Sequence, residues 1–402
     1  MFKRLLPAVL FLLLFPALSL HAQSDTQKPG ELEYRKFRVS LVPGLSSNGV
    51  DAVHYRSRYS FNILAGYNGA LAGLELGGLV NINKYEAEGL QFAGLANLSG
   101  QETTGLQFAG LINGAFGDME GLQWAGIANF SNASVQGLQF AGVANIGRQS
   151  IQGLEFAGAF NYSEGDVQGL LFAGAANISG GSMEGLLFSG ALNYAQHLEG
   201  IMASTVNISR KSEGIQMGVL NVSRQSEGIQ LGLLNYSDEF EGLPVGLISF
   251  YRDGRLNLAA WADASGFTNI GLKTGTWDIY NTFSIGYNPT LSGDIWQLGW
   301  TIGRHREYKH YFIDSDFSFF HINEGGWTDT VNQHYQYRVL FGTDLGPNTA
   351  IYAGPTLNML LSKSDRFAEY APYSFYDAGP GTAQFKMWFG LTAGIQFLRN
   401  KP

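Results

Sequence analysis

Residues 89–99 read GLQFAGLANLS, and residues 121–131 read GLQWAGIANFS. A unit of this kind, opening on Gly followed by Leu or Ile, recurs twelve times from Gly73 onward and ends at Phe250. The spacing is 16 residues up to Gly185, 15 to Gly200, and 14 thereafter, as in GIQMGVLNVS at 214–223. The residues that define the repeat are glycines and asparagines: Gly89, Asn97, Gly105, Asn113, Gly121, Asn129, Gly137, Asn145, Gly153, Gly169, Gly185, Gly214, Asn221, Gly228 and Asn235. Such regularity indicates one structural module copied in tandem.

The module is predicted to be β-structure. Two glycines in each unit would each cost a helix about 1 kcal/mol relative to alanine. Period-two alternation through residues 90–98 is instead typical of an extended strand. Long units have one residue more than short units before the second glycine, and an extra residue would turn all later side chains to the opposite face. A corner or bulge at the second glycine is therefore expected, because glycine permits it.

Two architectures fit the repeat. In a β-solenoid, each unit is one coil of two short strands, and identical residues stack about 4.8 Å apart. The asparagines would then form a ladder whose amides bond the turns. In an antiparallel meander, each unit is one strand long enough to cross a bilayer. Identity at the single-unit period favours the solenoid, although Glu199, Glu213 and Glu227 would then stack as like charges, at roughly 1 kcal/mol per neighbouring pair.

The chain after Tyr251 loses the repeat and shows aromatic-rich alternating runs. Such runs suit an antiparallel β-barrel with an apolar outer face. In the last run, residues 385–397, one face is entirely apolar. Phe389 lies on this face, and Phe397 is its last residue. This run resembles the closing strand of bacterial outer-membrane barrels, although five residues follow its final Phe397.

The domain organisation follows from these changes. Residues 1–22 have basic residues, an apolar run and a small residue at Ala22, and they are predicted to be a secretory signal peptide. Residues 23–72 form an N-terminal tail with two lead-in strands, 37–42 and 59–68. The repeat array occupies residues 73–250, and the barrel-like region occupies residues 251–402.

Composition and charge exclude several classes of function. The 402 residues contain no cysteine, which removes disulfides, thiolate nucleophiles and zinc–cysteine sites. The net charge of −8 argues against nucleic acid as a partner. The acidity is concentrated in the repeats, where 5 Lys or Arg face 16 Asp or Glu.

The sequence resembles a family of bacterial tandem-repeat surface proteins without an assigned biochemical role. The resemblance rests on the units GLQxAGxxN and GIQxGxxN and on GLPVGL at 242–247, followed by barrel-like strands. It covers about residues 37–397. It implies export to the outer membrane or cell surface, and it carries over no catalytic residue.

No reaction centre is predicted. The sequence has no nucleophile elbow, no HExxH and no phosphate-binding loop. The barrel-like region does contain residues that could ligate a metal, but without a recognisable ligand spacing: His305, His310, His321, His334, Asp314 and Asp316. We therefore expect no cofactor, no metal and no enzymatic activity.

Two functions are compatible with the sequence. The first is a non-enzymatic outer-membrane or cell-surface scaffold, in which the barrel contacts outer-membrane lipid and the repeats offer an extended surface to a surface protein or glycan. The alternative is a large transmembrane pore of about 22 strands, in which every repeat is a membrane strand.

Overall fold

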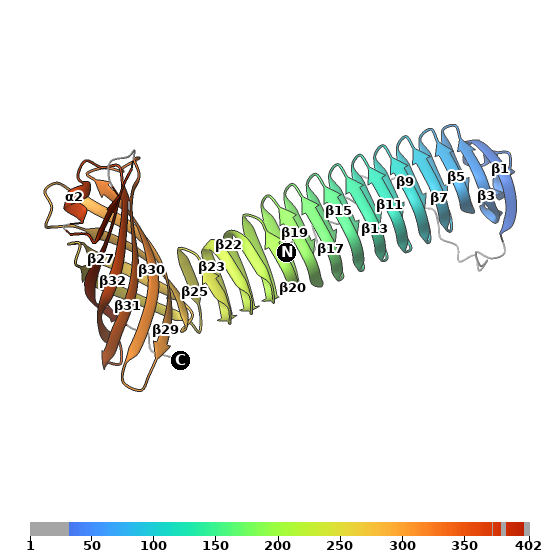
Figure 1. The fold of residues 1–402 in the computed structure, drawn as a ribbon. Coiled ribbons are helices and arrows are strands. Elements are labelled where there is room, and N and C mark those ends of the chain that lie inside the picture. Colours follow the sequence, from blue (N-terminus) through green and yellow to red (C-terminus); the bar gives the residue numbers. More distant parts are fainter. Residues whose placement is uncertain (1–31, 372, 379–382, 398–402) are drawn as a thin grey trace.

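The computed structural model describes residues 32–371, 373–378 and 383–397. The chain is all-β: a solenoid of about twelve coils over residues 56–251 is followed by a closed antiparallel barrel of eight strands (Figure 1). The predicted signal peptide, residues 1–22, lies outside the described residues and stays a prediction. Among the residues that the structure describes, no helix has the length and hydropathy of a membrane span.

Each long coil contains a longer and a shorter strand. The longer strands are β3 (Tyr55–Asn62), β5 (Ala70–Gly77), β7 (Ala87–Ala93), β9 (Thr103–Ala109), β11 (Met119–Ala125), β13 (Val135–Ala141), β15 (Ile151–Ala157), β17 (Val167–Ala173) and β19 (Ser182–Ser189). The shorter strands are β4 (Ala65–Asn68), β6 (Val80–Asn83), β8 (Ala96–Ser99), β10 (Ile112–Ala115), β12 (Ala128–Ser131), β14 (Ala144–Gly147), β16 (Phe160–Ser163) and β18 (Ala176–Ser179).

Neighbouring coils pair in parallel and in register with the repeat. Gly105 lies opposite Gly121, and Asn113 lies opposite Asn129. This pairing confirms the predicted solenoid. The antiparallel meander is wrong, and so is the 22-strand pore built from it. Parallel stacking prevails because it places identical amide side chains within bonding distance of each other, which an antiparallel arrangement would separate.

The chain turns at the second glycine of each unit, as predicted. In the coil of Gly89, strand β7 ends at Ala93, the bend occupies Gly94 and Leu95, and strand β8 follows. A Cβ atom on Gly94 would lie 2.2 Å from the carbonyl oxygen of Gly78 in the coil before. The corner therefore needs a residue without a side chain.

The shorter repeats extend the same stack up to the barrel. Their strands are β20 (Leu192–Ala203), β21 (Val206–Ser212), β22 (Ile215–Ser226), β23 (Ile229–Phe240), β24 (Leu243–Val245) and β25 (Ile248–Tyr251). Register is kept across the change of repeat length, since Asn193 pairs with Asn207 and Asn207 pairs with Asn221.

Strand β1 (Glu33–Val42) covers the N-terminal end of the stack and pairs in parallel with β3. It contains the predicted strand 37–42, and strand β2 (Leu45–Ser46) and the 3-10 helix η3 (Gly49–His54) follow it. The predicted strand 59–68 is divided between β3 and β4, so the coils begin ahead of Gly73. Arg38 of β1 is fully buried and donates hydrogen bonds to Ser60, Asn62 and the carbonyl of Tyr67.

The barrel is a single antiparallel sheet that closes on itself. Its strands are β26 (Arg255–Asp263), β27 (Thr268–Gly275), β28 (Ile279–Tyr287), β29 (Ile295–Glu307), β30 (Phe312–Glu324), β31 (Asn332–Gly346), β32 (Thr349–Ser362) and β34 (Gln384–Phe397). Strand β34, which carries Phe389 and Phe397, pairs with β32 on one side and β26 on the other. The short helix α2 (Phe367–Tyr370) and strand β33 (Tyr376–Ala378) lie between β32 and β34 in the sequence.

The last coil is hydrogen-bonded to the barrel. Asn281 donates to the carbonyl of Pro244 at 2.8 Å, and the Trp300 indole donates to the carbonyl of Gly246 at 2.7 Å. In Figure 1 the solenoid leaves the barrel sideways, and its long axis runs across the direction of the barrel strands. The solenoid therefore runs across the barrel strands and does not continue them end to end.

Candidate functional site

The interior of the solenoid contains a ladder of buried asparagines. Asn129 accepts a hydrogen bond from Asn113 at 3.0 Å and donates to Asn145 at 2.9 Å. The same amide donates to the carbonyl of Phe140 at 2.8 Å. Each of the repeat asparagines Asn97, Asn113, Asn129, Asn145, Asn221 and Asn235 is nearly or completely buried. The ladder thus joins each coil to the next, and its role is structural.

A second ladder of buried glutamines runs beside the first with the opposite polarity. Gln139 donates to Gln123, Gln123 to Gln107, and Gln107 to Gln91, each over 2.6 Å. Gln91 donates to the carboxylate of the fully buried Glu75 at 2.9 Å. The amide N–H groups of this ladder therefore point toward the N-terminal end of the solenoid. There the Glu75 carboxylate accepts the last hydrogen bond of the ladder.

Glu155 stands at the other end of the glutamine ladder. It lies opposite Gln139 in the pairing of β13 with β15. Burial raises the pKa of its carboxyl group to about 8. Neither oxygen of Glu155 accepts a hydrogen bond, and the Gln139 Oε1 acceptor has no donor. A protonated Glu155 can supply that donor, so the group is neutral in the folded protein at pH 7 and continues the ladder.

Replacing Glu155 with glutamine should make the solenoid less sensitive to pH. The wild-type carboxyl is ionised above about pH 4.5 when unfolded but protonated up to about pH 8 when folded. Stability should therefore fall as pH rises through this window, by at most about 1.4 kcal/mol per pH unit. Glu155→Gln removes this loss and should be the more stable protein at pH 7.5. The pH dependence of stability is measured in both proteins by amide hydrogen exchange of residues 151–173 at several pH values, corrected for intrinsic exchange rates. Equal pH slopes in both proteins would contradict the assignment.

The repeat glycines occupy backbone conformations and spaces closed to other residues. Positive φ angles, from +114° to +146°, occur at the opening glycines of the units from Gly89 to Gly200: Gly89, Gly105, Gly121, Gly137, Gly153, Gly169, Gly185 and Gly200. Gly214 and Gly228 lack such φ values, but a Cβ on either would lie 2.0 Å or less from the carbonyl oxygen of the glycine before. Sequence reasoning placed the conformational demand at the second glycine and missed the demand at the first.

The exposed charges of the solenoid lie on one edge. We define the charged edge as the residues one to five positions before each repeat glycine. Within residues 73–250, all of which the structure describes, every charged residue except the buried Glu75 and Glu155 belongs to it. The acids directly before the glycines are exposed and stack from coil to coil, as predicted for Glu199, Glu213 and Glu227.

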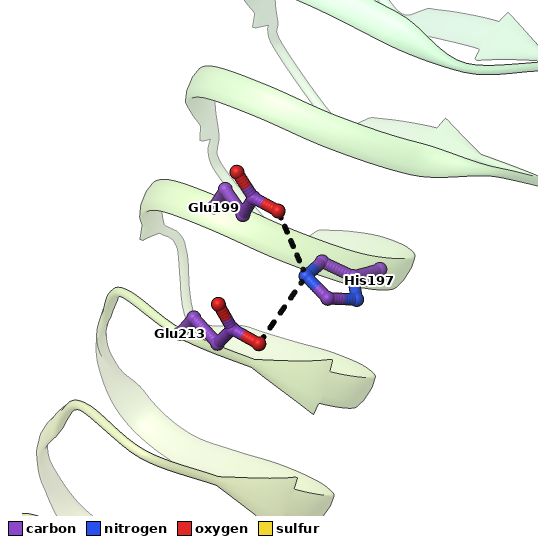
Figure 2. A group of neighbouring side chains, drawn as sticks. All are labelled: His197, Glu199 and Glu213. Carbon is purple, nitrogen blue, oxygen red and sulfur yellow. Dashed lines mark ion pairs between the residues drawn. The ribbon is translucent and has the colours of Figure 1, made fainter.

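Figure 2 shows one group on the charged edge, in which His197 lies between Glu199 and Glu213. His197 Nε2 is 3.2 Å from a Glu199 oxygen and 3.8 Å from a Glu213 oxygen. One His nitrogen and two carboxylates could hold a metal ion. Lys211, however, already contacts Glu213, and this hydrogen bond lowers the pKa of the Glu213 carboxyl. The group is therefore an exposed ion-pair network that relieves the repulsion between stacked acids.

The opposite side of the long coils carries a ladder of aromatic rings. Phe140, Phe156 and Phe172 stack in parallel, with ring centroids 5.2 and 4.9 Å apart. The rings line two adjoining shallow grooves that share Trp124. Small residues at the second glycine of each unit, such as Ala125 and Gly126, line the other side, and we call this bend with the residue after it the apolar corner. Because the ring faces cover one another, mainly the edges of the rings are accessible from the groove.

The barrel has a largely apolar outer face around an interior of mixed polarity. Arg255, Lys273, Asp314 and Arg338 are buried in the lumen, beside apolar clusters that include Phe320. Large apolar side chains are exposed on the outside of every barrel strand except β29: Leu256, Leu258, Ile270, Phe283, Ile285, Phe317, Tyr337, Phe341, Ile351, Phe389, Leu391 and Phe397. An apolar outer face around a lumen that holds charged groups is typical of a barrel in lipid.

The structure brings together only two of the metal-ligand candidates of the barrel, His305 and Asp314. His305 contacts Asp314 at 2.5 Å, but Lys273 also binds that carboxylate at 2.6 Å. Asp316 is paired with Arg338 at 2.7 Å. Of the other histidines, His334 bonds to Asn358 in the lumen and His321 to a loop carbonyl. The acids are thus neutralised by cations of the chain, and the histidines do not converge.

Comparison with known proteins adds no family. The chain matches no protein-family model, no curated protein and no solved structure. Conclusions about function therefore rest on the geometry of the solenoid and the barrel.

Proposed function

We propose that this protein is a non-enzymatic scaffold of the outer membrane, held there by the barrel. The observation that carries the proposal is the outer face of the barrel, where large apolar side chains are exposed on seven of the eight strands, while the charged side chains of Arg255, Lys273, Asp314 and Arg338 face the lumen. A water-soluble barrel would not expose a contiguous apolar belt of this extent. Closure of the sheet through β34 also pairs both edges of the barrel sheet. A sheet that lies in a bilayer requires this pairing, because lipid cannot bond free backbone groups.

The solenoid supplies the scaffold. Its coils repeat the same side chains at the same positions, so any contact is spread along the array instead of concentrated in a pocket. The charged edge is the surface that we propose for a partner, either a surface protein or a glycan that carries positive charge. The ladders and glycines of the repeat hold this edge straight.

The anchor can be tested with two arginine substitutions on the outer surface of the barrel. Leu391 lies at the middle of β34 and Thr268 at the start of β27, and both face outward and are exposed. Leu391→Arg should destabilise the barrel by about 2–4 kcal/mol in vesicles, because the charge enters the hydrocarbon, whereas Thr268→Arg should cost about 1 kcal/mol or less. Urea unfolding followed by heat-modifiable gel migration measures both. Release of the wild-type chain from cells without detergent would contradict the proposal.

A further inference from the structure

The solenoid resembles the barrel in exposing apolar side chains over much of its outer surface, while its interior holds the amide ladders beside an apolar cluster. In the coil of Gly121, the outward side chains beyond the charged edge are Leu122, Trp124, Ile127, Ala128 and Phe130. The stacked equivalents of these five positions contain no charged residue in residues 73–250, all of which the structure describes. Trp124 is 54% exposed and Ile127 43% exposed. The apolar surface thus covers both sheet faces and the corner that joins them.

The apolar surface of the solenoid is larger than a protein docking site and has a different shape. Soluble monomers rarely expose a contiguous apolar patch of more than a few hundred Å². A folded partner or a second copy would cover one face, whereas here two opposite faces and a corner are apolar. Hydrocarbon chains can surround all three. The surface also continues toward the barrel through Leu243 and Leu247, which are exposed in the last coil.

The backbone N–H groups of the apolar corner are paired inside the solenoid. The amide of Gly126 bonds to the carbonyl of Ala109, and the amides of Ile127 and Ala128 both bond to the carbonyl of Leu111, over 2.9–3.2 Å. The same pattern recurs in neighbouring coils. Internal pairing of backbone groups is the condition for placing a chain in lipid, and the donors of these corners meet it.

The orientation of the solenoid axis and the width of the apolar surface also match a position inside a membrane. If the barrel strands cross a bilayer, an axis that runs across them lies along the membrane and not away from it (Figure 1). From Leu122 to Ile127 the chain advances five residues, and because it bends at Gly126 and Ile127 the span is at most about 17 Å, the length of five extended residues. One leaflet of hydrocarbon is about 15 Å deep, half of a 30 Å core.

We infer that the solenoid lies in one leaflet of the membrane, with its apolar corner near the midplane and its charged edge at the water interface. The inference rests on the proposed membrane barrel, because the barrel fixes the height and direction of the solenoid. The charged edge is then the part of the solenoid that remains accessible to a partner.

The experiment uses single cysteines in the full chain, which has none of its own. Cysteines at Ile127 in the apolar corner, Gln136 on the charged edge and Leu391 on the barrel are labelled with an environment-sensitive fluorophore. Each protein is reconstituted in phosphatidylcholine vesicles, with quenchers in the lipid (doxyl chains) or in the water (iodide). Val143→Cys, at the next corner, replaces Ile127→Cys if the latter fails to fold, and heat-modifiable migration confirms a folded barrel.

Lipid quenching should be at least about twofold stronger at Ile127 and Leu391 than at Gln136, and iodide should show the reverse order. Lipid quenching at Leu391 with iodide quenching at Ile127 would overturn the inference and leave the membrane barrel intact. A label at Ile127 shielded from both quenchers would overturn it in favour of a protein interface. A label at Leu391 that lipid does not quench would remove the membrane barrel, and the inference with it.

Discussion

Gly137→Ala should destabilise the middle of the solenoid by about 3 kcal/mol or more. The φ angle of Gly137 is +144°, a region nearly restricted to glycine and costing other residues about 1–3 kcal/mol. An added Cβ would also lie 1.9 Å from the carbonyl oxygen of Gly121, which must move, at about 1–3 kcal/mol for overpacking. Because each coil contacts only its neighbours, the damage should stay local.

Gly114→Ala provides the matched control, two coils away from Gly137. Gly114 has no positive φ, and its stacked neighbours are Leu98 and Phe130. An added Cβ there would meet the mobile end of the Leu98 side chain at 2.9 Å. We expect a change within about 0.5 kcal/mol. Hydrogen-exchange protection is followed over residues 119–157 for Gly137→Ala and over residues 96–131 for Gly114→Ala, and an equal, small loss in both would show that the opening glycine is not required.

Asn129→Leu should cost about 3–5 kcal/mol, because one substitution removes the four hydrogen bonds of a fully buried side chain. The leucine keeps the approximate size of the side chain but leaves the Asn145 oxygen and the carbonyl of Phe140 without this donor. It also takes away one of the acceptors of Asn113. The loss should appear as reduced hydrogen-exchange protection in β12 and in the two strands stacked on it, β10 and β14.

Asn132→Leu is the control for the amide ladder. Asn132 lies on the charged edge and accepts a hydrogen bond from Arg148 on the surface of the solenoid. Its replacement should change stability by less than about 0.5 kcal/mol. If Asn129→Leu is as well tolerated as Asn132→Leu, the ladder contributes alignment but little free energy.

The sequence predicts the repeat module, its strands, the corner and the barrel because each depends on a local pattern. Glycine spacing defines the coil, and alternation in residues 385–397 defines the outer face of β34. The favoured parallel stacking follows from identity at the single-unit period. These features require no knowledge of which distant residues meet.

The remaining features depend on contacts between coils. Hydrophobic burial alone would place Leu122 and Trp124 inside, yet the amides of Gln123 and Asn129 occupy the interior, because each finds an identical partner one coil away. The opposite polarity of the two ladders, the neutral Glu155 and the burial of Arg38 likewise follow from register in three dimensions. The pairing of His305 with Asp314 needs the barrel to be closed.

A stack of parallel strands with identical side chains one above another has the geometry of a fibril segment. Such a stack would grow by adding further chains at any open end. Here each end of the stack joins a different structure. Strand β1 and the buried guanidinium of Arg38 cover the first coil, and the barrel is bonded to the last. The array is thus a cross-β assembly whose length is set by the gene and not by concentration.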